Sequence, residues 1–234
     1  MLTNAEIKRV RSLREKKFRD EFGQFVVEGE KMVEEALTSG FRVNAVYRMD
    51  EVGAEAMERM SQLSSPSPVL AVVEKPAPRG LVLERGLYLG LDSVRDPGNM
   101  GTILRLADWF GVSTVFASPD SVEIFNPKVV QASMGSVFRV HAVYSDLPDI
   151  CRRFRAADMP VYGTFLDGDD IYSLGLSSEG LVIMGNEANG ISAEVAKFVS
   201  SRLFIPSFAK GRTAESLNVA AATAITLSEF RRRG

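Results

Sequence analysis

From residue 87 onward, apolar segments of strand length alternate with segments of helical pattern. This alternation constrains the fold strongly, because strands joined by helices pair in parallel in one sheet, with helices covering both faces. We therefore predict an α/β fold with a mostly parallel sheet. The expected strands lie near residues 87–92, 114–117, 137–143, 161–165, 181–184 and 203–205, and the expected helices near 99–110, 127–134, 147–157, 192–200 and 216–231.

A stretch rich in proline, serine and glycine precedes this region. Residues 63–86 hold four of the ten prolines around one short apolar strand, which indicates a domain boundary near residue 80. We therefore predict two domains, residues 1–80 and 81–234. In the first, a small α/β unit, we expect helices within 8–21, 30–40 and 54–63, and strands within 23–29, 43–49 and 68–75.

The scarcity of cysteine and histidine excludes several kinds of chemistry. Cys151 and His141 are each the single residue of their type, so no internal disulfide can form and a zinc site is disfavoured. His141 lies in an apolar alternating stretch, which is typical of a structural histidine. No signal peptide and no apolar run of membrane-spanning length is found, so we expect a cytoplasmic protein with no membrane or metal partner.

Positive charge is concentrated near the start of the chain, although the net charge is only −2. Residues 8–19 carry seven lysines and arginines against one acid, Glu15, and residues 231–233 are three arginines. Such clusters are either solvated faces or surfaces for a polyanion. The local charge, unlike the net charge, is therefore compatible with nucleic-acid binding.

Ligands of parallel sheets bind at the carboxyl ends of the strands, where three polar loops are expected. The first, DSVRDPGNMG (92–101), leads into a helix whose predicted buried stripe is Ile103, Leu106, Ala107 and Phe110. Arg105 falls on the opposite face of that helix. It is either an ordinary solvent-facing arginine or a clamp for an anionic group.

The second loop, GNEANG (185–190), has glycines at both ends but matches neither the dinucleotide fingerprint nor a phosphate loop. Its Glu187 would repel phosphate, and suits a cationic ligand or a hydrogen-bond network; a plain turn is the alternative. The third loop, PSFAKGRTAES (206–216), is basic and leads into a helix. Small residues on one face of that helix, which would let another helix or subunit approach closely, are Ala220, Ala221, Ala224 and Ser228.

In this order, DSVRDPGNMGTILRLADWFGV, LVIMGNEANGIS and LFIPSFAKGRTAESLNVAAATAI resemble the three signature motifs of the SpoU (TrmH-type) RNA 2′-O-ribose methyltransferases. These belong to the wider SPOUT class. The resemblance covers about residues 87–231 and includes NPKVVQASMGSVFRV (126–140). The stretch from Ser12 to Leu37 also resembles the accessory RNA-binding domain that many members carry.

The resemblance implies S-adenosylmethionine as the methyl donor, a parallel sheet tied in a deep trefoil knot, and a homodimer. It also implies methylation of a ribose 2′-hydroxyl in structured RNA, with ribosomal RNA favoured over transfer RNA. The knot follows from the resemblance alone, because knots are rare among protein folds. The small residues of the last helix would then belong to the knotted core or to the dimer interface.

Carried over position by position, the resemblance assigns roles to individual residues. The polar positions around the reacting ribose are Asn99, Arg105, Glu187, Ser216 and Asn218. The residues expected around the cofactor are Thr164, Leu166, Gly185, Gly190, Ile205 and Leu217. The residues expected to contact RNA phosphates are Arg9, Arg11, Arg14, Lys16, Lys17, Arg19, Lys210 and Arg212.

Two departures and three alternatives stay open. The third loop is longer than expected between Pro206 and Ser216, which leaves the role of Gly211 open, and Gln131 stands where a basic residue is common. A non-catalytic RNA-binding or ribosome-assembly protein on the same fold would bind the methyl donor without turnover. A SPOUT enzyme that methylates a base would be distinguished from a ribose methyltransferase by nucleoside analysis. An unrelated nucleotide-binding enzyme is disfavoured, because the sequence lacks the glycine motifs of such enzymes.

Overall fold

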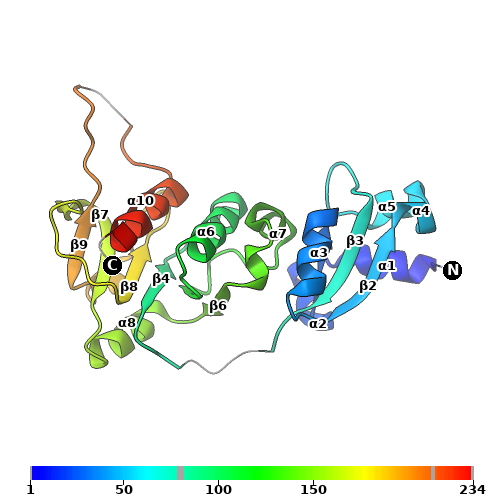
Figure 1. The fold of residues 1–234 in the computed structure, drawn as a ribbon, viewed down its shortest axis with the longest axis horizontal. Helices are drawn as coiled ribbons and strands as arrows, with labels where there is room; N and C mark the ends of the chain where they lie inside the picture. Colours follow the sequence, from blue (N-terminus) through cyan, green and yellow to red (C-terminus); the bar gives the residue numbers. More distant parts are fainter. Residues whose placement is uncertain (1, 78–81, 212–213, 233–234) are drawn as a thin grey trace. The chain divides into compact units, whose positions relative to one another are not determined.

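The computed structural model describes residues 2–77, 82–211 and 214–232 (Figure 1). Their contacts divide the chain into two compact units, residues 1–80 with 123–139, and residues 81–122 with 140–234. The predicted boundary near residue 80 falls on residues 78–81, which lie outside the described residues. In the described part of the chain, no helix is both long and apolar enough to span a bilayer.

The first unit is a three-stranded antiparallel sheet, in the order β1-β3-β2, with helices packed against it. Its core includes Ile7, Leu13, Met57, Met60 and Leu70. The elements are α1 (Asn4–Ser12), α2 (Lys16–Phe22), β1 (Gln24–Glu28), α3 (Glu30–Thr38), β2 (Val43–Arg48), α4 (Met49–Val52), α5 (Ala54–Met60), β3 (Val69–Glu74), α7 (Pro127–Ser133) and the 3-10 helix η1 (Ser136–Phe138).

The segment from Glu123 to Arg139 packs with this unit, although residues 81–122 of the other unit separate it from the unit's first part in sequence. The ring of Phe25 in β1 lies 4.5 Å from that of Phe125 and 6.2 Å from that of Phe138, measured between centroids. All three side chains are buried. The sequence predicted two continuous domains and did not predict that residues 123–139 pack with the first one. Only long-range contacts reveal this packing.

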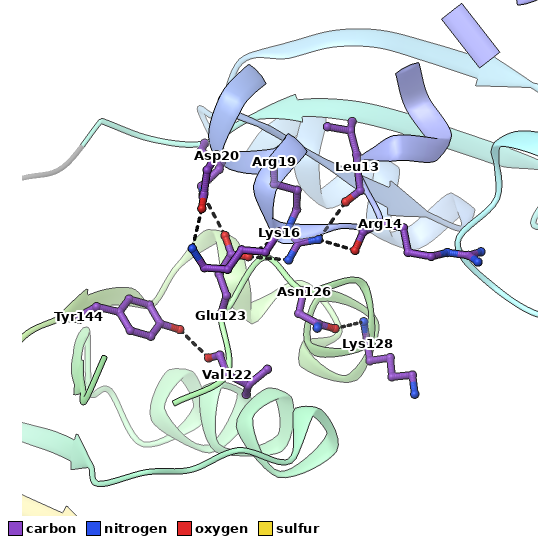
Figure 2. Close-up of polar contacts among 11 residues, drawn as sticks. Leu13, Arg14, Lys16, Arg19, Asp20, Val122, Glu123, Asn126, Lys128 and Tyr144 are labelled. Atoms are coloured by element: carbon purple, nitrogen blue, oxygen red, sulfur yellow. Dashed lines mark hydrogen bonds and ion pairs between the residues drawn. The ribbon is translucent and has the colours of Figure 1, made fainter. Parts of the chain in front are cut away.

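An ion-pair cluster around the buried Arg19 holds that segment (Figure 2). Arg19 in α2 is 2% exposed and donates to the main-chain oxygens of Leu13 and Arg14, at 2.9 and 2.7 Å. Its Nε and Nη2 atoms also donate to Oε2 of Glu123, at 3.0 and 2.6 Å. Lys75 donates to the other carboxylate oxygen of Glu123, at 2.8 Å. The burial of Arg19 is thus compensated by a nearly complete set of acceptors.

The second unit is built on a six-stranded sheet in the order β6-β5-β4-β8-β7-β9, with all neighbouring strands parallel. The prediction of a parallel α/β sheet is confirmed. Its elements are β4 (Leu87–Leu91), α6 (Pro97–Trp109), β5 (Thr114–Ala117), β6 (His141–Tyr144), α8 (Leu147–Ala156), β7 (Val161–Asp170), β8 (Gly180–Met184), α9 (Ala193–Ala196), β9 (Ser201–Phe204) and α10 (Val219–Arg232).

Several predicted elements differ in extent. The strand expected at 137–143 is only β6, because Met134 and Gly135 both adopt positive φ (50° and 97°) and turn the chain into η1. The helix expected at 192–200 is shortened to α9. The single helix expected within 8–21 is two, α1 and α2. The last helix begins at Val219 rather than 216, because the side chain of Asn218 accepts from the main-chain N–H groups of Ala220 and Ala221.

The buried stripe of α6 starts one turn earlier than predicted. Met100, Ile103, Leu104 and Ala107 are fully buried, whereas Leu106 and Phe110 are only partly buried. The pattern i, i+3, i+4, i+7 therefore holds from Met100 onward.

We predict that Arg19→Ala lowers the free energy of unfolding by about 3 kcal/mol, because it leaves the half-buried carboxylate of Glu123 to Lys75 and removes the donor to two main-chain oxygens. Urea denaturation provides the measurement. The control is Lys16→Ala, which removes the exposed pair with Asp20 and is expected to cost less than about 0.5 kcal/mol. Equal losses in the two variants would contradict the prediction.

Candidate active site

The carboxyl ends of four neighbouring strands bring the three polar loops together. The strands β4, β8, β7 and β9 are adjacent and parallel, so the segments that follow them leave from the same edge of the sheet (Figure 1). These segments are 92–96 after β4, 185–190 after β8 and 205–218 after β9. The sheet topology therefore collects segments that are more than a hundred residues apart in sequence.

The side chain of Asn99 connects all three loops. Its Nδ2 atom donates to Oε1 of Glu187 at 2.7 Å, and its Oδ1 atom accepts from Nδ2 of Asn218 at 2.9 Å. A carboxylate only accepts hydrogen bonds, so Glu187 determines which way the Asn99 amide is oriented, and that leaves its oxygen for Asn218. Three of the five residues predicted around the ribose thus form one hydrogen-bonded network.

Main-chain contacts position the two outer members of this network. Asn99 lies in the first turn of α6, where its N–H donates to the capping carboxylate of Asp96 at 2.8 Å. Asn218 caps α10 with the same oxygen that accepts from Ala220 and Ala221. The network therefore joins the N-terminal ends of α6 and α10, two helices that also pack against each other.

The loop after β8 is closed by its own backbone. Asn186 and Gly190 exchange two main-chain hydrogen bonds of 2.9 Å, and Gly190 has a φ of +67°. A Cβ on Gly185 would lie 2.3 Å from the carbonyl carbon of Gly190 and 2.4 Å from the nitrogen of Ile191. The position of Gly185 therefore requires glycine for steric reasons, which explains the glycine that the sequence pattern singled out.

Two residues that the sequence analysis missed hold this loop to its neighbours. Asn186 donates to the main-chain oxygen of Ser93 at 2.7 Å, and the buried carboxylate of Asp92 accepts from the N–H of Ser192 at 2.7 Å. A signal for Asp92 was available, since it is an acid directly after a buried strand. Asn186 gave no such signal, because its role depends on a main-chain oxygen 93 residues away.

The loop after β4 is held by an aspartate. Asp120 accepts from the guanidinium of Arg95 and the hydroxyls of Ser93 and Ser118, at 2.8, 2.6 and 2.7 Å. Arg95 and then the two serines hold the pKa of Asp120 well below its usual range. This carboxylate also holds Ser93, whose φ of 58° is unusual for a residue with a side chain.

In the part of the chain that the structure describes, no hydrogen bond joins the other predicted site residues to the Asn99 network. Arg105 is exposed on α6, and Ser216 is exposed in the loop before α10. Thr164 is half-buried and donates to the main-chain oxygen of Ile183 at 3.3 Å. Leu166 and Leu217 are 68% and 51% exposed. Ile205 directly follows β9 and is half-buried.

The basic residues of the first unit behave in two ways. Arg9, Arg11, Arg14, Lys16 and Lys17 are exposed on and between α1 and α2. Arg19 is buried, so its assignment to the RNA-contacting set is wrong: its guanidinium is used by Glu123 and two main-chain oxygens. Lys210 is exposed in the second unit, and Arg212 lies outside the described residues.

Comparison with known proteins assigns the fold and these motifs to one family. Residues 86–228 match the SpoU rRNA Methylase family, and residues 4–76 match the MRM3-like substrate binding domain. The chain belongs to the SpoU rRNA methylase family. It is 32% identical over 244 residues to the Bacillus subtilis (strain 168) 23S rRNA (guanosine(2553)-2′-O)-methyltransferase RlmP, an alignment covering 97% of this chain and 96% of that protein.

Solved structures agree over the whole chain. A TrmH-family protein from Porphyromonas gingivalis superposes with a TM-score of 0.91 at 42% identity, covering 100% of both chains. An rRNA methyltransferase from Sinorhizobium meliloti, solved with S-adenosylmethionine bound, superposes with a TM-score of 0.88 at 33% identity, covering 99% of this chain and 96% of that one. Both likenesses include the two units described above.

We predict that Gly185→Ala abolishes binding of S-adenosylmethionine, because the added methyl group displaces the chain at Gly190 and opens the loop. Isothermal titration calorimetry measures the affinity. Gly175→Ala is the matched control, because a Cβ there meets no atom within 4 Å. An affinity in the Gly185→Ala variant within about twofold of the parent, less than 0.5 kcal/mol, would show that the close approach is unimportant.

Proposed function

We propose that this protein transfers the methyl group of S-adenosylmethionine to a ribose 2′-hydroxyl in ribosomal RNA. The observation that carries the proposal is the Asn99 network, which holds the three family motifs together at one edge of the sheet. The B. subtilis relative named as a 23S rRNA 2′-O-methyltransferase supports it, since nearly the full length of both chains aligns.

The strand ends fit S-adenosylmethionine by shape and charge. Gly185 lets the loop after β8 close on the backbone of Gly190 and Ile191, which gives the ligand a preformed main-chain surface. Leu166 and Leu217 offer exposed apolar surface of the kind that packs against an adenine ring. Glu187 is an acid where the ligand carries positive charge, and Thr164, Gly190 and Ile205 complete the expected surroundings. When bound, S-adenosylmethionine supplies an electrophilic methyl group.

The protein has to align the ribose and manage one proton. In our proposal the 2′-oxygen forms its bond to the methyl carbon while the carbon–sulfur bond breaks, and the hydroxyl proton leaves to water, to a phosphate or to a polar neighbour. Arg105 does not take that proton, because a guanidinium offers hydrogen-bond donors and no acceptor. It binds the adjacent phosphate through two parallel hydrogen bonds and stabilises negative charge on the 2′-oxygen. Asn99, Asn218 and Ser216 orient the ribose.

Residues expected to contact the RNA occur in each unit. The exposed lysines and arginines of α1 and α2 lie in the region that matches a substrate-binding domain. Lys210, and by prediction Arg212, add charge next to the site. Ribosomal RNA is favoured over transfer RNA by the relatives named as rRNA methyltransferases. For the place of action we propose the cytoplasm, because the bacterial relative is named as a ribosomal RNA methyltransferase.

We also propose a homodimer that uses α6 and α10. Trp109 at the end of α6 is 84% exposed, and Ala221 and Ser228 are exposed on α10, which packs on α6. Exposed tryptophan is enriched at protein–protein interfaces, and small residues on a neighbouring helix allow a partner to approach closely. The trefoil knot stays a prediction from the resemblance.

The proposal is tested by incubating the protein and S-adenosylmethionine with ribosomal and transfer RNA from a strain lacking this gene. Nucleoside mass spectrometry then identifies the product. We expect a new 2′-O-methylnucleoside in ribosomal RNA. A methylated base would instead indicate a base methyltransferase, and donor binding without any methylation would indicate the non-catalytic RNA-binding protein.

We predict that Arg105→Lys lowers kcat by about 100-fold although it keeps the charge, because lysine cannot bind phosphate through two parallel hydrogen bonds. Single-turnover methylation of ribosomal RNA measures the effect. Arg155→Lys, at another exposed helical arginine of the same unit, is the control and is expected to leave the rate unchanged. Near-normal turnover in Arg105→Lys would refute the role of Arg105.

A further inference from the structure

Four residues of β7 bulge out of its pairing with β9. In the pairing of β7 with β9, Leu203 is the partner of Thr164 and again of Asp169. Residues 165–168 therefore project from the ladder between two pairings with the same residue. Because β7 lies between β8 and β9, this projection emerges between the Gly185 loop and the segment after β9.

The side chain of Arg202 contacts residues of this projection before and after Leu166 in sequence. The guanidinium carbon of Arg202 lies 3.5 Å from the centroid of the Phe165 ring, and its Nη2 atom forms an ion pair with Asp167. The Phe165 ring also packs against Gly163, where a Cβ would come within 2.8 Å of the ring atom Cε2. Phe165 thus contacts both the bare backbone of Gly163 and the guanidinium of Arg202.

The backbone of the projection is packed against the same residue. A Cβ on Gly168 would lie 2.7 Å from the main-chain oxygen of Arg202, so the two segments are in direct contact. The hydrogen bond from Arg202 also lowers the pKa of Asp167. Residues 165, 167 and 168 are therefore each secured by Arg202, and Leu166 is left as the free, 68% exposed tip.

We propose that Arg202 is a positioning residue for S-adenosylmethionine, acting through the main chain and side chain of Leu166. The inference rests on the proposed function, in which Leu166 lines the cofactor site. Without Arg202, the four-residue projection would have to become ordered when the ligand binds, and that ordering weakens affinity. Only arginine can stack its planar face on Phe165 while its edge donates to Asp167.

The test compares Arg202→Ala and Arg202→Lys with the parent protein. Titration calorimetry gives the Kd for S-adenosylmethionine, and methylation of ribosomal RNA gives KM for the cofactor and kcat. We expect Arg202→Ala to raise both Kd and KM about tenfold, with kcat at saturating cofactor unchanged. Arg202→Lys keeps an ion pair with Asp167 but loses the stacking, and should fall between the two.

Arg152→Ala is the matched control. Arg152 also lies over an aromatic ring, that of Phe198, at 5.7 Å, and also pairs with an aspartate, Asp149, but it stands on α8. Its loss should leave Kd and KM unchanged. Hydrogen exchange on the cofactor-free protein adds a readout independent of activity: the amides of residues 166–168 should exchange faster in Arg202→Ala. If that variant fails to fold, Arg202→Lys and Phe165→Leu provide the same comparison.

Two failures are distinguishable. A parent protein that binds no S-adenosylmethionine would overturn the proposed function and this inference with it. A parent that binds and methylates, together with a folded Arg202→Ala variant of unchanged Kd, would overturn the inference alone. A fall in kcat with unchanged KM would also overturn it, because positioning of the cofactor acts on its binding.

Discussion

The two hydrogen bonds of the Asn99 side chain are the interaction on which the candidate site depends. The amide donates to Glu187, which lies 88 positions further along the chain, and accepts from Asn218, which lies 119 positions further along. Two distant segments therefore meet at one side chain. The carboxylate determines the orientation of that amide, and the amide in turn directs Asn218, which also caps α10. The start of two packed helices and the loop after β8 are thereby coupled. A change at any of the three residues alters the hydrogen bonding of the other two.

The sheet brings the three loops close enough for these few hydrogen bonds to join them. Parallel strands deliver their loops to the same edge, and the order β4-β8-β7-β9 makes the loops direct neighbours. Each loop is then held by a different interaction. Asp120 accepts hydrogen bonds in the loop after β4, and the loop after β8 closes on itself at Gly185. Contacts of Arg202 hold the projection of β7. Catalysis by alignment needs such preorganisation, because small displacements of reacting groups cost large factors in rate.

The sequence predicted what local pattern encodes and missed what distant contacts decide. Alternating apolar and helical segments were sufficient for the parallel sheet, and polar residues after strands indicated the three loops. Arg19 was misassigned because its partner, Glu123, lies 104 residues further along the chain. The packing of residues 123–139 with the first unit was missed for the same reason. The projection of β7 could not be predicted, since its sequence, TFLDG, has the composition of an ordinary strand end.

The account is tested most directly by a double-mutant cycle on Asn99 and Asn218, with kcat for methylation of ribosomal RNA as the readout. If the two side chains act as one unit, Asn99→Ala and Asn218→Ala each lower kcat by about 100-fold, and the double variant is no slower than either single variant. Circular dichroism of the three variants verifies that the fold is retained. Losses that multiply in the double variant would contradict the account, because they would mean that the two residues contribute independently.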